Sequence, residues 1–72
     1  MTTKEIRKIT VSIDSKNVIH YQIGMTAGDD YRLEHILVRD NFFDLYVKKD
    51  GETQLWKAFK SDVVIHVEYI LD

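Results

Sequence analysis

Residues 63–71 are the most constraining segment of the chain, because they form an apolar run without glycine or proline. The odd-numbered positions are all apolar: Val63, Ile65, Val67, Tyr69 and Leu71. The even-numbered positions combine apolar and polar side chains: Val64, His66, Glu68 and Ile70. Successive side chains of a strand point to opposite faces, so the odd set shares one face of a sheet. At an open edge such a strand would template aggregation, and we therefore expect an interior strand or one covered by another element or chain.

Residues 6–14 and 18–25 predict an antiparallel hairpin. In the first segment Ile9, Val11 and Ile13 alternate with polar side chains. In the second, Ile19, Tyr21, Ile23 and Met25 occupy every other position. The residues between the two segments, Asp-Ser-Lys-Asn at 14–17, are typical of turns because their side chains bond to the local backbone.

Residues 31–39 fit two structures. As a helix, the segment would be capped by Asp29 or Asp30 and would place Leu33, Ile36 and Leu37 on one face. As a strand, the apolar run at 36–38 would be buried on both faces. We favour the strand, because β-branched residues and short length both weaken a helix.

A second hairpin is predicted for residues 42–48 and 53–59, joined by a turn at Asp50 and Gly51. A two-residue loop places Leu45 opposite Trp56, and Trp56 joins the core face while Asp44 meets Lys57 on the other. A three-residue loop with a bulge moves Trp56 to the face of Tyr46. We favour Trp56 as a core residue, because large apolar side chains are mostly buried.

The chain is therefore predicted to be mainly β, with residues 1–72 forming one small domain. We expect an antiparallel meander of five or six strands in a curled sheet, sandwich or barrel; the alternative is ββαβββ with a helix near 30–40. A domain of this length buries only about 60% of its unfolded surface. It has no cysteine to add disulfides. We therefore expect self-association, as a homodimer or with another protein partner.

Enzymatic and metal-dependent functions have no support in the sequence. The chain shows no nucleophile elbow, no phosphate-binding glycine loop and no cysteine to pair with a histidine. His20 and His66 would form a metal site with Glu68 or Gln22 if they projected from adjacent strands on one face, but their spacing does not require it. We expect no catalytic residue, no metal and no cofactor, with His20, His35 and His66 on the polar side of a sheet.

Binding is the function that the composition favours. The expected surface consists of Tyr46, Lys48, Trp56 and Lys57, since exposed aromatic residues beside long cationic side chains suit a protein contact. We expect a non-enzymatic, self-associating protein-interaction module, accessory to a larger assembly. The alternative is a small β-barrel that binds single-stranded nucleic acid. Twelve acidic residues against ten basic ones disfavour nucleic acid, whose binding surfaces are normally basic.

The sequence also bears on the compartment. No apolar run is long enough to span a bilayer. The charged residues near the N-terminus are not followed by the apolar stretch of a signal peptide. A cytoplasmic protein without membrane contact is the expectation.

Overall fold

The computed structural model describes residues 5–28 and 31–70, and these form six strands and one short 3₁₀ helix. In chain order the elements are β1 (Ile6–Ser12), β2 (Val18–Gln22), β3 (Arg32–Arg39), β4 (Phe42–Lys49), β5 (Glu52–Lys60), η1 (Ser61–Val63) and β6 (Val64–Tyr69). The prediction of a mainly β protein is confirmed. The helical alternative for residues 30–40 is wrong over the described part of that range, because β3 is a strand.

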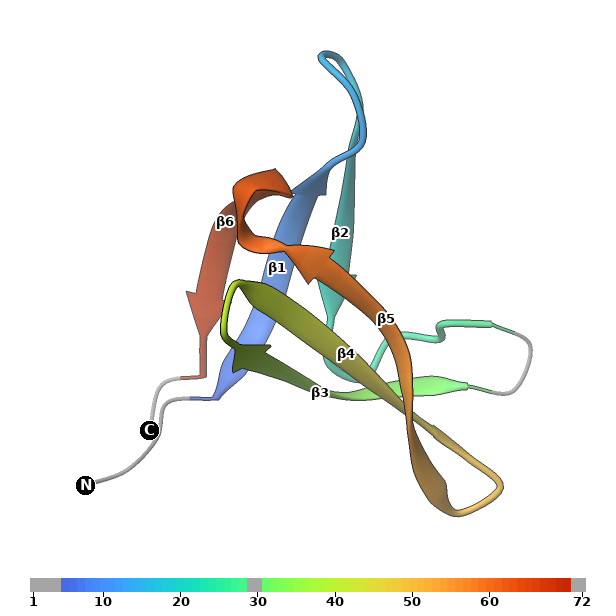
Figure 1. The fold of residues 1–72 in the computed structure, drawn as a ribbon. Helices are drawn as coiled ribbons and strands as arrows, with labels where there is room; N and C mark the ends of the chain where they lie inside the picture. Colours follow the sequence, from blue (N-terminus) through green and yellow to red (C-terminus); the bar gives the residue numbers. More distant parts are fainter. Residues whose placement is uncertain (1–4, 29–30, 71–72) are drawn as a thin grey trace.

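The strands form two antiparallel three-stranded sheets, which do not close into a barrel. The first sheet has the order β2-β1-β6 and the second the order β3-β4-β5. Figure 1 shows the second sheet running obliquely in front of the first, with β6 beside β1 and away from β5. The second sheet is a simple meander, whereas the first is completed by a strand from the far end of the chain.

The expectation of an interior position for residues 63–71 is wrong for the strand that the structure describes. β6 pairs with β1 and forms one edge of its sheet. A β-bulge also breaks the odd–even pattern, because Thr10 lies opposite His66 while Val11 lies opposite Val64. Val64 therefore takes the inward position that alternation predicted for Ile65, whose side chain is 59% exposed. Position 71 lies outside the described residues. Covering by another chain stays a prediction.

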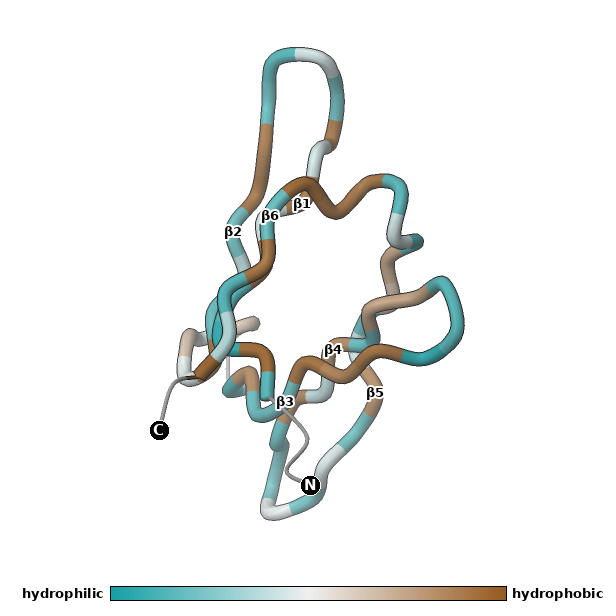
Figure 2. The backbone as a smooth tube through the Cα atoms, turned by 90° about the vertical axis from the view of Figure 1, so that its left-hand side faces the viewer, coloured by the Kyte–Doolittle hydropathy of each residue, from teal (hydrophilic) through white to brown (hydrophobic). Residues whose placement is uncertain are grey.

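The core lies between the two sheets and takes residues from four strands. Its most buried members are Ile6, Ile9, Val11, Tyr21, Leu33, Ile36, Leu45 and Val47. The central strands β1 and β4 supply five of these eight residues. Figure 2 shows hydrophobic stretches along β6 as well as along β4, although β6 contributes only half-buried side chains such as Val67 to the core. Hydrophobicity alone therefore did not decide which strands became central.

The second hairpin begins in the register of the two-residue loop and then departs from both predicted registers. At the turn, Lys49 pairs with Glu52, which is the two-residue loop, and Asp50 and Gly51 have φ angles of 52° and 80°. A bulge at Trp56 then shifts the pairing by one residue, so that Leu45 lies opposite Lys57 instead of Trp56. The predicted pairing of Asp44 with Lys57 is therefore wrong, and Asp44 lies opposite Ala58.

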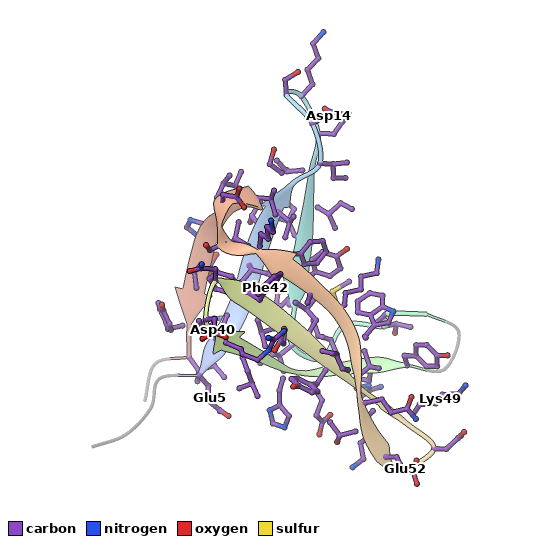
Figure 3. The ribbon with its side chains drawn as sticks, in the orientation of Figure 1. Glu5, Asp14, Asp40, Phe42, Lys49 and Glu52 are labelled. Atoms are coloured by element: carbon purple, nitrogen blue, oxygen red, sulfur yellow. The ribbon has the colours of Figure 1, made fainter. Side chains whose placement is uncertain are left out.

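The first hairpin ends in the predicted turn, and Asp14 organises it. One carboxylate oxygen, Oδ1, accepts hydrogen bonds from the backbone N–H groups of Lys16 at 2.8 Å and Asn17 at 2.9 Å. The hydrogen bond from the Asn17 side chain, together with these N–H groups, lowers the pKa of Asp14 below its ordinary value. Figure 3 places Asp14 at the tip of this hairpin, far from Glu52 at the tip of the other.

Candidate functional site

The four residues of the predicted binding surface lie on two different faces of the second sheet. Trp56 packs half-buried against the core on the inner side, and the ammonium of Lys57 lies 4.6 Å from the centre of its indole ring. Tyr46 lies on the outer face, opposite His35 on β3 and Leu55 on β5. Lys48 follows Tyr46 by two positions on the same strand and shares its face. The structure therefore brings together Trp56 with Lys57, and Tyr46 with Lys48, but not all four.

Trp56 and Lys57 belong to an aromatic cluster where β5 approaches β2. The ring of Tyr21 meets Trp56 edge-to-face at 5.7 Å and Phe59 at 5.4 Å between centroids. Lys57 also lies 5.9 Å from the Tyr21 ring. The bulge at Trp56 makes this arrangement, because it turns two consecutive side chains toward the same side of the strand. The cluster stabilises the contact between the two sheets and leaves Lys57 exposed above it.

The outer face of the second sheet holds a nearly buried ion pair. Asp44 is only 2% exposed, and its two carboxylate oxygens accept hydrogen bonds from Arg39 Nε at 2.8 Å and Nη2 at 3.3 Å. The hydrogen bond to Asp44 raises the pKa of Arg39 above its ordinary value. The same guanidinium lies 5.2 Å from the centre of the Phe42 ring. Because both carboxylate oxygens are engaged, this pair stabilises the sheet and offers little to a substrate.

The histidines do not converge on one point. His20 on β2 and His66 on β6 both lie opposite Thr10, so they share the outer face of the first sheet. They are separated by the whole width of β1, which corresponds to about 9–10 Å between strands. Thr10 Oγ1 is within 2.9 Å of His20 Nδ1, whereas His66 Nε2 lies 3.3 Å from Glu68. Over residues 5–28 and 31–70, no group of three or more potential ligands is close enough to hold a metal ion.

An open hollow of about 430 Å³ lies where β4 and β5 meet η1. It is lined by Asn41, Phe42, Lys60, Ser61 and Asp62. The backbone N–H of Ser61 is already bonded to the carbonyl of Asn41 at 2.7 Å. This lining contains a cation at the end of β5, Lys60, and a carboxylate in η1, Asp62, but no histidine or cysteine, and it lacks the paired base and nucleophile of a hydrolytic site.

The surface that sequence reasoning missed is the edge of β6. Three large apolar side chains are exposed there: Ile65 at 59%, Tyr69 at 45% and Ile70 at 39%. The alternating pattern did signal an apolar strand, but it assigned Ile65 and Tyr69 to the core face and only Ile70 to the opposite face. Their exposure follows from the edge position and from the bulge at Ile65, neither of which a local pattern records.

In the described part of the chain, no helix has the length and hydrophobicity to cross a membrane. Comparisons with models of protein families, with curated proteins and with solved structures give no match to this chain.

Proposed function

We propose that this protein is a non-enzymatic protein-interaction module that associates with itself and serves a larger assembly. The observation that carries the proposal is the edge strand β6, where the side chains of Ile65, Tyr69 and the following residue, Ile70, are exposed. An edge strand presents backbone donors and acceptors that can pair with another chain. Natural proteins usually protect such an edge, and an apolar edge that is left exposed favours a partner.

The core of the domain gives a second reason for a partner. Only eight apolar residues of the described chain are buried, and β5 and β6 contribute none of them. A short domain without disulfides gains stability when association buries further apolar surface. The outer strands β2, β3 and β5 leave other edges for a different protein, which suits an accessory component of a larger assembly.

The experiment is a measurement of molar mass against concentration, by light scattering and sedimentation. We expect the mass to approach twice 8.5 kDa between micromolar and near-millimolar concentration. Far-ultraviolet circular dichroism should show a β spectrum at both ends of the range, which confirms that the folded protein associates. A monomer at every concentration would refute self-association.

Binding of single-stranded nucleic acid is the second candidate, and the contact between Lys57 and Trp56 favours it. A cation stacked on an indole ring is a feature of base-stacking surfaces. Asp50, Glu52 and Asp62 lie on or next to the same strand pair and oppose a phosphate backbone. Retention on an oligonucleotide column that falls with salt, together with quenching of the only tryptophan, would favour this candidate. Passage through the column at low salt would exclude it.

A further inference from the structure

The backbone of β6 shows which of its residues face the open edge. The N–H of Ile70 donates a 2.8 Å hydrogen bond to the carbonyl of Glu5 and so points toward β1. Backbone groups of an antiparallel strand alternate between its two sides. From Ile70 to His66 the strand has no inserted residue, because the bulge at this end lies at Arg7 on β1. Val67 therefore turns its N–H and C=O away from β1, toward the edge.

Symmetry limits how two copies of β6 can pair. Two antiparallel edge strands of identical chains are related by a two-fold axis perpendicular to the sheet. Such an axis keeps each face on its own side, so within the regular stretch from His66 to Ile70 residues that lie opposite each other must both be odd-numbered or both be even-numbered. In each permitted register, one residue lies at the two-fold axis, opposite the same residue of the second chain. We call this residue the centre of the register.

Only a few centres lie within the strand, and their side chains differ in compatibility. With Val67 at the centre, His66 faces the partner's Glu68 on the same face of the joined sheet. With His66 at the centre, two imidazoles face each other and Glu68 faces an apolar partner. With Glu68 at the centre, two carboxylates face each other, which is destabilising. Of these three registers, only the one centred on Val67 places a carboxylate opposite each His66.

We infer that β6 pairs with β6 of a second copy, antiparallel and centred on Val67, so that the two first sheets become one continuous sheet of six strands. The inference rests on the proposed self-association and names its surface. Each Val67 donates its N–H to the carbonyl of the partner's Val67. Glu68, which lies 3.8 Å from Lys8 within its own chain, also faces the partner's His66.

The pairing covers the side chains that the single chain leaves exposed. At each end of the short ladder, the exposed side chains of Ile65 and Tyr69 lie next to the partner's strand, on opposite faces of the joined sheet because the bulge turns Ile65 off the inner face. The bulge at Ile65 confines the backbone ladder to the residues around Val67 and leaves Ile65 to contribute by side-chain contact. A ladder this short predicts a reversible dimer instead of an extended fibre, because the two-fold axis uses β6 of both copies and leaves neither for a third.

Single cysteines test the centre of the register, since the chain has no cysteine of its own. In Val67→Cys the two Cα atoms would lie about 5.5 Å apart, which suits a disulfide. Oxidised glutathione should therefore convert this variant to a covalent dimer. Ile65→Cys alone is the matched control and should not cross-link, because the Cα atoms of residue 65 in the two chains would lie about 13 Å apart. An equal mixture of His66→Cys and Glu68→Cys should cross-link as a heterodimer, because these positions lie opposite each other on one face, and it tests the same register without changing Val67.

Charge variants test the facing pairs. His66→Glu should raise the dissociation constant of its homodimer about tenfold, because each introduced carboxylate would face the partner's Glu68. Glu68→Lys should weaken its own homodimer to a similar extent. The mixture should form a heterodimer, because each chain then offers the charge that the other requires. Sedimentation of the separate and mixed variants measures this.

The outcomes separate this inference from the proposed function. A wild-type dimer with cross-linking at Val67 and in the His66–Glu68 mixture, but not at Ile65 alone, supports the register. A wild-type dimer in which neither Val67→Cys nor the mixture cross-links overturns the β6 pairing and leaves self-association standing. A wild-type chain that stays monomeric overturns both.

Discussion

Strands β4 and β6 resemble each other in sequence but hold different places in the fold. β4 (Phe42–Lys49) contains three buried residues, including Leu45 at 0% exposure. β6 (Val64–Tyr69) is at least as apolar along its length, yet none of its residues is fully buried. β4 is joined to both of its neighbours by tight turns and becomes central, whereas β6 must return to β1 across the whole chain and adds at an edge. The position of a strand thus depends on its connections as well as on its hydrophobicity.

The largest expected effect is in β4. Leu45→Ala should lower the free energy of unfolding by about 2–5 kcal/mol, because it leaves a cavity in the centre of the core. Leu55→Ala is a matched control on the adjacent strand, where the same side chain is 55% exposed, and it should cost less than about 1 kcal/mol. Urea denaturation measures both. If both variants lost the same free energy of unfolding, the described difference in burial between Leu45 and Leu55 would be wrong.

The next prediction tests whether β6 supports the core despite its edge position. Val67→Asp should lower the free energy of unfolding by about 2–3 kcal/mol, because Val67 faces the fully buried Ile9. The loss is limited because Val67 is half-buried at an edge, where the new carboxylate partly reaches water. An interior position would have meant loss of folding. Ile65→Asp, on the same strand, should leave the melting temperature of the monomer nearly unchanged. Both are measured at micromolar concentration, and an unchanged Val67→Asp variant would place Val67 in solvent.

A moderate effect is expected at the ion pair beside β4. Arg39→Met should cost about 1–3 kcal/mol, because it leaves the carboxylate of Asp44 without its guanidinium donor in a nearly buried position. The loss is smaller than for a fully buried pair, since Arg39 is 56% exposed. The double variant Arg39→Met with Asp44→Leu should recover part of the stability. If Arg39→Met unfolds at the same urea concentration as the wild type, Asp44 must have other donors.

The smallest effect is expected in the turn that joins β1 to β2, the strand at the other edge of the first sheet. Asp14→Ala should lower the melting temperature slightly at pH 7, since two backbone donors lose their acceptor. The folded state lowers the pKa of Asp14, so its carboxylate stabilises the fold above the ordinary pKa of about 4. This contribution disappears as the pH falls through the lowered value. The difference between variant and wild type should therefore shrink toward pH 2, and a constant difference would contradict this origin.

Local patterns were enough to predict most strands of this protein, although residues 31–39 fitted a helix as well as a strand. The alternation in residues 6–14, 18–25 and 42–48, together with the turn residues around Asp14 and Asp50, predicted both hairpins. Alternation reports on one strand at a time, and a turn reports on the neighbours that it joins. Both signals depend on residues that are close together in the chain, so they can be recognised without the tertiary structure.

Pairing between distant segments, and the bulges that adjust it, came only from the tertiary structure. The bulge at Trp56 put Lys57 beside its indole ring and separated both from Tyr46, which divided the predicted binding surface. The return of β6 to β1, with a bulge at Ile65, turned an expected interior strand into an exposed edge. A shift of one residue reverses every later side chain, and it is chosen by the packing of the whole core. Strand identity was therefore a property of the local sequence, whereas the face and neighbour of each strand were decided by contacts far apart in the chain.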